Sequence, residues 1–313
     1  MNKGSKLPLF ISAALRSFST GAIWVRSRAV QNIALMLSVK GVMVGSIYAL
    51  ISLGFNVIFR TTGVLNFAQG EFVMVGGIMA AWLYGTGKMS LGAAMALGVL
   101  GAGLVGVSVD LLAIRPVRKA KPVIHIIITV GVSIVLKALA GLVWGTDRFH
   151  LPPIRPGSLS VGGIQVELQS LLMLGTAGVC MAGLGCFFHG TATGRAMRAC
   201  AENPDAARLC GVNPGRVSAL AFGLSALLGG IAGVLLTPMV SMQFDQGTML
   251  GLKGFSAAIL GGLGKPVGGV LSGVLLGVLE QFSAWMSSVY KETLALALVV
   301  VVLLLRPKGV FSK

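Results

Sequence analysis

The sequence predicts an all-α integral membrane protein, and three observations support this fold class. The 313 residues are 55% hydrophobic and only 11% charged, whereas soluble domains carry about 25% charged residues. Apolar runs recur along the whole chain, and each is long enough to cross, or help to cross, about 30 Å of hydrocarbon. Lys and Arg gather in the short stretches between these runs, which is typical of a membrane topology signal.

The apolar runs define eight hydrophobic segments, and these must be helical because lipid cannot satisfy open backbone groups. Many of the 45 glycines lie inside the runs, which favours close helix packing. We expect a basic tail over 1–32, one transmembrane domain over 33–306 and a short C-terminus over 307–313. The eight segments lie at about 33–59, 61–84, 91–114, 123–146, 168–188, 217–240, 254–284 and 289–306.

The basic residues predict which ends of the segments face the cytoplasm. The tail 1–32 holds five Lys and Arg residues, and loops 115–121 and 189–216 hold four each. Three more follow residue 305. Because cytoplasmic loops carry an excess of Lys and Arg, we place all four regions, including both termini, in the cytoplasm. The net charge of +16 is then a topology signal, and no aromatic and basic motif suggests nucleic-acid binding.

This orientation requires residues 33–114 and 217–306 each to begin and end in the cytoplasm, although each contains three apolar runs. One run in each group should therefore enter and leave on the same side. The middle runs are the candidates, because polar and glycine residues break them at Gly63–Glu71 and Gly261–Pro266. We expect two parallel repeats, each with a broken or re-entrant helix, as in transporters whose solute path follows the repeat interface.

The first break contains Glu71, the residue with the clearest functional meaning. A carboxylate inside an apolar run costs about 2.5–3.5 kcal/mol on insertion scales, so it needs water, a partner or a pathway. Asn66 and Gln69 accompany it, and Gly70 allows the helix to unwind. Two interpretations stay open: a polar pathway element or gate, and a brace that accepts backbone N–H groups at the break. The second break contributes Gly262, Gly264 and Lys265.

Other charges at membrane depth have simpler interpretations. Lys40, Asp110 and Glu280 sit near segment ends, where long side chains can reach the interface. An interfacial or packing role therefore suffices for them. Lys137 lies deeper in its run, and Glu71 and Glu280 are its candidate partners.

The loop 189–216 is too long for a tight cytoplasmic turn. Asn203 before Pro204 is a good helix start and Gly211 a good stop, so we expect a short helix over about 204–210. Its small alanines suit docking into a partner's groove, although a solvated surface loop is the alternative. The candidate docking residues are Arg195, Arg198, Glu202, Asp205, Ala206, Ala207 and Gly211.

Nothing in the sequence indicates an enzyme active site, a metal site or a bound cofactor. Gly87-Lys88 and Gly264-Lys265 lack the rest of a phosphate-binding loop. The three histidines are scattered. The cysteines form neither a C-x-x-C pair nor a zinc-like spacing, and we expect them to be reduced; they are Cys180, Cys186, Cys200 and Cys210.

Several stretches closely resemble the permeases of branched-chain amino acid ABC transporters, over about residues 35–310. They are Gly45–Gly54 followed by Gly63–Glu71, Arg195–Gly233, Phe255–Gly264 and Leu304–Gly309. The resemblance implies a helical subunit of the bacterial cytoplasmic membrane that pairs with a second permease. It also implies two cytoplasmic ATPase subunits that bind ATP, and a solute-binding protein outside. In the family, the loop that matches Asp205–Gly211 docks onto the ATPase.

One departure from the family concerns Gln69, where the family usually has His. This argues against any role at that position that needs a titratable group. The resemblance implies transport of branched-chain amino acids, with ATP hydrolysis on separate subunits. Permeases for urea or short-chain amides are an alternative substrate class. A stand-alone secondary transporter with Glu71 as an ion site, and a membrane scaffold, are alternatives of other classes.

Overall fold

The computed structural model describes residues 9–87, 89–118, 120–161 and 164–286, together with a few single positions between 293 and 304. Side-chain environments are described from residue 33 onward. The long helices are α1 (Leu9–Thr62), α2 (Gln69–Thr86), α3 (Leu91–Val109), α4 (Pro122–Trp144), α5 (Leu168–Gly190), α8 (Pro214–Leu236), α9 (Gln246–Gly261) and α10 (Pro266–Met286). The shorter elements are a π turn η1 (Asp110–Ile114), a 3-10 turn η2 (Arg115–Val117), α6 (Ala192–Glu202), α7 (Pro204–Leu209) and a hairpin of β1 (Ser158–Val161) and β2 (Ile164–Glu167).

Six helices in the described part of the chain are long and apolar enough to cross a membrane. The prediction of a helical membrane protein is thereby confirmed at the level of fold class. The spans are Ile33–Thr62, Leu91–Val117, Pro122–Trp144, Leu168–Gly190, Pro214–Leu236 and Pro266–Met286.

The prediction of eight segments is not reproduced in detail. The run expected over 254–284 as one broken segment is two helices, and α9 and α10 are separated at the predicted break, Gly261–Pro266. The helix α2 is not among the six spans, since Gln69 and Glu71 lower the hydropathy of its first turn. Most of the segment expected over 289–306 lies outside the described residues.

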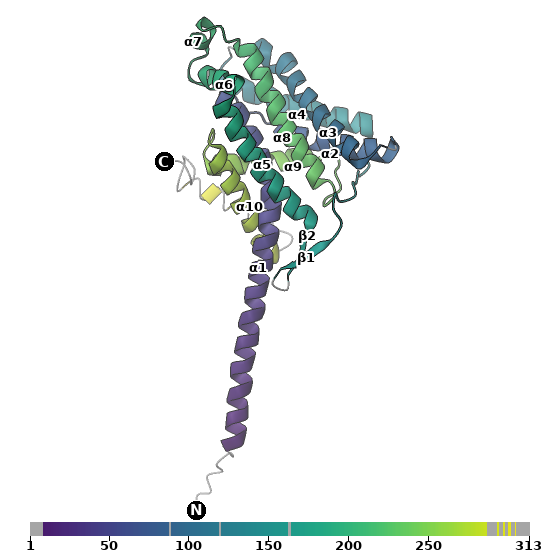
Figure 1. Ribbon diagram of the computed structural model, residues 1–313, viewed down its shortest axis with the longest axis vertical. Coiled ribbons are helices and arrows are strands. Elements are labelled where there is room, and N and C mark those ends of the chain that lie inside the picture. Colours follow the sequence, from purple (N-terminus) through teal and green to yellow (C-terminus); the bar gives the residue numbers. More distant parts are fainter. Residues whose placement is uncertain are drawn as a thin grey trace, which may run out of the picture.

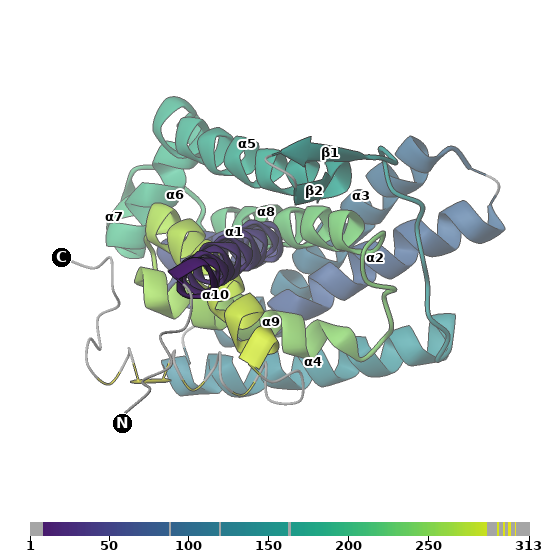
Figure 2. The same cartoon turned by 90° about the horizontal axis from the view of Figure 1, so that it is seen from below.

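The core of the bundle is built around α1 and α8. In the 18-residue apolar window of the α1 span, 83% of the residues are buried, whereas in the windows of α4 and α5 the buried share is 17% and 22%. Viewed from below, α4 and α5 lie on opposite sides of the group formed by α1, α8 and α9 (Figure 2). The central helices are therefore held by protein, and the two outer helices offer most of their surface to lipid or to a partner.

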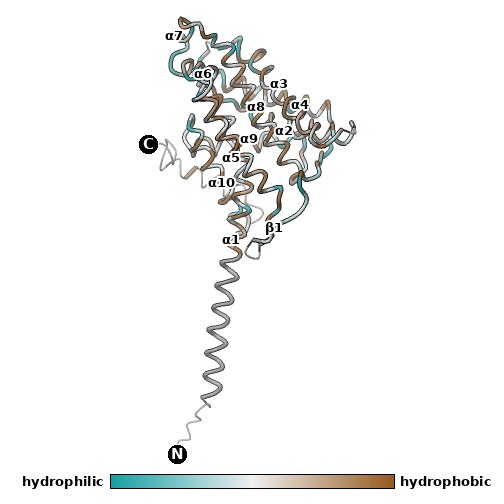
Figure 3. Tube along the Cα trace, viewed as in Figure 1, coloured by the Kyte–Doolittle hydropathy of each residue, from teal (hydrophilic) through white to brown (hydrophobic). Residues whose placement is uncertain are grey.

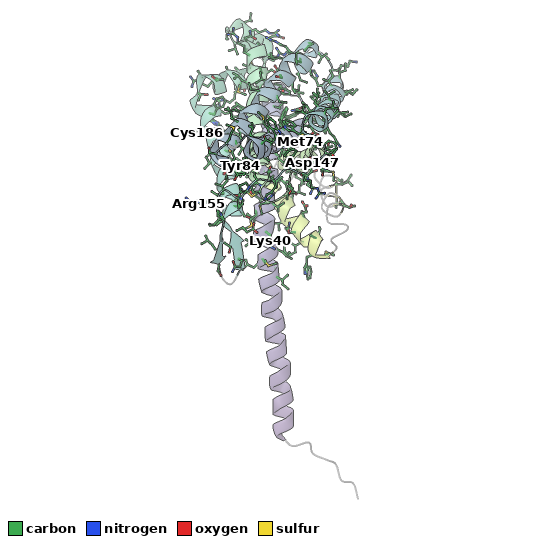
Figure 4. All side chains as sticks on the ribbon, turned by 90° about the vertical axis from the view of Figure 1, so that its right-hand side faces the viewer. Lys40, Met74, Tyr84, Asp147, Arg155 and Cys186 are labelled. Carbon is green, nitrogen blue, oxygen red and sulfur yellow. The ribbon has the colours of Figure 1, made fainter. Side chains whose placement is uncertain are left out.

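Backbone-to-backbone contact joins the central helices. A Cβ atom added at Gly45 of α1 would lie 2.6 Å from Val274 Cα of α10, and one at Gly277 would lie 2.3 Å from Gly45 N. A Cβ atom at Gly233 of α8 would lie 2.0 Å from Val73 O of α2. Small residues thus permit close packing without a hydrophobic driving force between helices. Side chains fill the remaining space of the helical body, with Met74 inside it (Figure 4).

The bundle has two unlike ends (Figure 1). At one end, the last residues of α1, the turn after η2, and α6 and α7 surround a common cavity. At the other end lie the β1–β2 hairpin and the loop in which Phe149 forms a β-bridge with Met242. Hydrophobic residues follow the helices of the body, while hydrophilic residues gather at α6 and α7 (Figure 3).

The position of α1 bears on the expected sidedness of the tail 1–32, which stays a prediction. The span Ile33–Thr62 is one unbroken helix, and its Thr62 end lies beside α7. Its Ile33 end, and the part of α1 that precedes it, therefore lie at the opposite end of the bundle (Figure 1). Residues 9–32 of α1 and the loop 189–216 therefore lie at opposite ends of the bundle.

Candidate functional site

The first predicted break is a short connection between α1 and α2. The helix α1 ends at Thr62, and Gly63 takes a positive φ of 68° that favours glycine. Asn66 is 1% exposed, and its Oδ1 accepts the N–H of Ala68 at 3.1 Å. The backbone carbonyl of Asn66 accepts the N–H of Gln69 at 3.3 Å. Asn66 therefore forms the turn from which α2 begins.

Gln69 joins α2 to α1 and α8 through hydrogen bonds that are wholly buried. Its Nε2 donates to the carbonyl of Ser225 at 3.1 Å, and its Oε1 accepts the Ser225 hydroxyl at 2.5 Å. The same hydroxyl lies 2.8 Å from the carbonyl oxygen of Gly54, another acceptor. The amide is thus satisfied by hydrogen bonds that involve no titratable group.

Glu71 joins α2 to α4 and α9. Its Oε1 accepts the hydroxyl of Ser133 at 2.9 Å and that of Thr248 at 3.0 Å. The residue has no exposed surface, and a Cβ atom at Gly247 would lie 2.3 Å from Oε2. The carboxylate therefore braces three helices through two hydroxyl groups, and not through backbone N–H groups as the brace interpretation expected.

Neither candidate partner of Lys137 forms a described ion pair with it. The Nζ of Lys137 lies 6.0 Å from the ring centroid of Phe244, a cation–π geometry. Glu280 pairs instead with Lys253, with 2.8 Å between Nζ and Oε1. Asp110, expected near the interface, has no exposed surface and accepts the hydroxyl of Ser218.

The second predicted break is the turn between α9 and α10. Gly262 and Gly264 take positive φ values of 86° and 81°, and the N–H of Lys265 donates to the carbonyl of Gly262 at 3.0 Å. A Cβ atom at Gly261 would lie 2.2 Å from the carbonyl carbon of Gly268, so the two helices meet closely just beyond the turn. The phenyl ring of Phe59, near the end of α1, approaches Gly264.

Both breaks lie against the same stretch of α1. The ring of Phe255, on α9, lies 5.0 Å from that of Phe67 in the first break and 5.6 Å from that of Phe55 on α1. Gly269, just past the second break, faces Asn56 of α1. Parts of both breaks thus lie beside the C-terminal third of α1, and none of the three polar residues Asn66, Gln69 and Glu71 lines a described cavity.

The predicted docking helix is present as α7. The Oδ1 of Asn203 accepts the N–H groups of Asp205 and Ala206, both at 3.0 Å, and Gly211 follows the helix with a φ of 81°. Ala207 is 4% exposed and packs inward, whereas Ala206 is exposed. The two alanines therefore do not share an outer face.

The outer surface of α7 includes a residue that sequence reasoning missed. Leu209 is 92% exposed and lies one turn after Ala206. Asp205 and Arg208 form an exposed ion pair at 3.0 Å. Of the remaining predicted docking residues on α6, Arg195 and Glu202 are exposed and Arg198 is half-buried.

A cavity of about 680 Å³ lies behind α7, between it and the ends of the membrane helices. Thr62, Arg118, His125 and Asp205 are among its lining residues. Cys200 of α6 also lines it, and burial raises the pKa of that thiol, although the positive charges of Arg208 and Arg118 lower it in part. The α6–α7 segment is therefore not packed solidly against the bundle, and this space leaves room for it to shift.

Comparisons with known proteins were made on the whole chain. The family described as "Branched-chain amino acid transport system / permease component" matches residues 37–305. The high-affinity branched-chain amino acid transport system permease protein LivH of Escherichia coli K12 is 35% identical over 290 residues, which are 88% of this chain and 94% of the relative. The corresponding protein BraD of Pseudomonas aeruginosa is 33% identical over 294 residues, with the same coverage.

A more distant relative carries a different solute in its name. The ribose import permease protein RbsC of Escherichia coli K12 is 24% identical over 252 residues, which are 75% of this chain and 74% of the relative. No solved structure matches the chain. The similarity to permeases of import systems therefore extends along most of the helical body described above.

Proposed function

Since the chain belongs to the branched-chain amino acid transport permease family, we propose that it is the membrane-spanning permease subunit of an ATP-binding cassette importer for branched-chain amino acids. The observation that carries this conclusion is the 35% identity over 88% of the chain to a permease of that transport system. The protein is a multi-pass helical protein of the inner membrane. The alternative substrate class, urea or short-chain amides, is not favoured.

The partners follow from the proposed role. A second, similar permease subunit would complete the membrane domain, and two cytoplasmic ATPase subunits would bind and hydrolyse ATP. A solute-binding protein would deliver the amino acid from outside. The exposed face of α7, with Leu209 and the Asp205–Arg208 ion pair, supports a docking role because an apolar side chain of that size gains from burial in a groove.

We place the end that carries α6 and α7 in the cytoplasm. The loops 115–121 and 189–216 meet at this end and hold four basic residues each, as cytoplasmic loops do. The Ile33 end of the α1 span would then face outward. The five basic residues of the tail 1–32 would lie outside as well, against the usual charge bias, which the two loops together outweigh.

The two breaks would act as a joint in the transport cycle. We assign re-entrant or broken geometry, related by a parallel repeat, to the regions around Gly70 and Gly262. ATP-driven closure of the ATPases would move α6 and α7 into the cavity behind them. The weakly buried α4 and α5 would shift against the rigid centre, a change between two packed states. Glu71 braces the break in the state described, and would meet the solute only if that brace opened.

The test is reconstitution of the chain with its second permease, ATPases and binding protein in vesicles. ATP-dependent uptake of labelled leucine, without uptake of labelled urea, is the expected result. Replacing Leu209 by Asp should uncouple ATP hydrolysis from uptake, since it places a charge at the centre of the docking face. Uptake by the purified chain alone, driven by a proton or sodium gradient, would contradict the proposal and support a secondary transporter.

A further inference from the structure

A second cavity lies apart from both breaks and from α7. It has a volume of about 520 Å³, within the range of small-molecule sites. Residues of α1, α5, α9 and α10 line it, and its wall includes Met239 and Asp245 from the loop between α8 and α9. Because that loop contacts the Phe149 loop at the end opposite α7, the cavity lies on the side from which an importer receives its solute.

A buried ion pair lies in the polar part of this cavity, which also includes Asp245, Gln246 and Gln281. Lys253 of α9 and Glu280 of α10 have side chains that are 12% and 7% exposed, and their Nζ and Oε1 atoms are 2.8 Å apart. The hydroxyl of Tyr48 on α1 donates to Oε2 of Glu280 at 2.6 Å. The Nζ of Lys253 also lies 5.5 Å from the ring centroid of Tyr48. A positive and a negative group therefore stand side by side at the wall of one cavity.

The rest of the wall is mainly aliphatic. Branched and thioether side chains line it, and these adapt to irregular apolar shapes. They are Val44, Ile47, Met173, Leu236, Met239, Val240, Met249 and Leu250. The cavity thus combines the Lys253–Glu280 ion pair, with the carboxylate of Asp245 elsewhere in its wall, and an apolar chamber.

A buried ion pair between α9 and α10 needs a reason beyond helix packing. Removing two charges from water is costly, and apolar residues of similar size often replace a buried pair without loss of stability. The adjoining α1–α10 and α9–α10 contacts already rest on glycine-mediated backbone packing. Charged residues within membrane helices are a mark of solute pathways, and this pair faces a cavity large enough for a solute.

We propose that this cavity is a subsite for a zwitterionic aliphatic α-amino acid on its way through the permease, an inference that rests on the proposed function. Lys253 binds the α-carboxylate, and Glu280 binds the α-ammonium group, so the ligand exchanges partners with the existing ion pair. Tyr48 positions the Glu280 carboxylate. The aliphatic side chain of the ligand packs against the methionine and leucine side chains, of which Met249 is the best exposed. Sugars and urea lack this pair of charges.

A charge-swap variant separates this role from that of a structural brace. In Lys253→Glu/Glu280→Lys, the two charges exchange places and the ion pair between α9 and α10 is kept. If the ion pair is only a structural brace, the swapped pair still provides it. An amino acid carries its carboxylate and its ammonium group on one carbon, so it cannot meet the reversed charges and keep its side chain in the same chamber. We expect the swapped complex to assemble with wild-type thermal stability and to lose leucine uptake by about thirtyfold or more.

The control is Lys137→Met, which removes a membrane-depth lysine outside the cavity and should leave leucine uptake unchanged. Wild-type leucine uptake by the charge-swap variant would overturn the subsite and leave the ion pair with a structural role only. Wild-type complex that takes up no leucine at all would contradict the proposed function instead, so the two failures are distinguishable.

A second measurement covers the case in which the swapped protein does not assemble. Met249→Cys places a thiol in the apolar wall, and its alkylation in the assembled complex can be followed by mass spectrometry of that peptide. Leucine should slow the alkylation, whereas leucinamide and 4-methylpentanoate, each lacking one of the two charges, should not. Equal protection by all three compounds, or by none, would overturn the proposal.

Discussion

Glu71 lies within α2 with no exposed surface, and the hydroxyls of Ser133 and Thr248 take the place of water at its Oε1 atom. The carboxylate is thus a hydrogen-bond acceptor shared by three helices. An amide carbonyl accepts the same two hydrogen bonds, so this role needs the shape of the side chain and not its charge.

Glu71→Gln should therefore assemble and transport leucine at close to the wild-type rate. Glu71→Leu should lose about 1–3 kcal/mol of stability, because it leaves two buried hydroxyls without their acceptor. Thermal unfolding and leucine uptake of the reconstituted complex measure both effects. A Glu71→Gln complex that assembles normally but does not transport would show that the charge itself is needed, as the pathway interpretation holds.

At the residue scale, the sequence identified the special positions but not their partners. An isolated carboxylate in an apolar run marks Glu71 on sight, because its insertion cost requires compensation. Ser133 and Thr248, which compensate it, come from helices far along the chain and carry no local signal. Nothing in the local sequence marks Lys253 either, because its pairing with Glu280 depends on how α9 and α10 meet.

Among the elements, α7 is a short helix whose ends are fixed by its caps. Asn203→Ala removes the acceptor for the N–H groups of Asp205 and Ala206, and loss of such a cap costs about 0.5–2 kcal/mol of helix stability. We expect the complex to assemble while ATP hydrolysis becomes less coupled to uptake. Asn203→Asp keeps the acceptor and should retain coupling, so equal behaviour of the two variants would contradict a role for the cap.

The contact between α1 and α10 depends on glycine at the points of closest approach. Gly45→Ala places a Cβ atom 2.6 Å from Val274 Cα, and overpacking of this kind costs about 1–3 kcal/mol. Gly131→Ala on α4 is the matched control, because nothing lies within 4 Å of its added Cβ atom. Thermal unfolding of the two variants should separate them, and equal midpoints would mean that α10 moves aside without cost.

The sequence predicted the ends of helices well where apolar residues give way to polar ones, and poorly where the run stays apolar. The start of α7 at Pro204 was evident from its capping residues. The break at Gly261–Pro266 was also predicted, but glycine is common inside the helices as well and did not show that the run 254–284 forms two separate helices there. Whether the two breaks belong to parallel repeats stays a prediction.

For the whole molecule, the charge pattern and the position of α1 favour different sides for the tail 1–32. Five basic residues favour the side of the loop 189–216, whereas α1 carries residues 9–32 to the opposite end of the bundle. Short-loop charge is only a statistical guide to topology, whereas an unbroken helix across the bundle is a geometric constraint. The close backbone contacts along α1 hold this helix in its position across the bundle.

Sidedness can be measured with a membrane-impermeant thiol reagent on intact cells. The native Cys210, exposed beside α7, should remain unlabelled until the membrane is opened. Cysteines introduced by Asp147→Cys, at the hairpin end, and by Ile33→Cys, at the start of the α1 span, should both label from outside. Labelling of Cys210 in intact cells would invert the orientation, and labelling of position 33 only after lysis would restore the original expectation for the tail.

The glycine contacts between α1 and α10 also limit which amino-acid substitutions these positions can accept in natural populations. Every amino-acid change from a glycine codon adds at least one carbon to a position such as Gly45 or Gly277, where the facing backbone leaves no room for it. Codons for these positions should therefore show almost no missense alleles across natural populations, while the codon for Gly131 tolerates them.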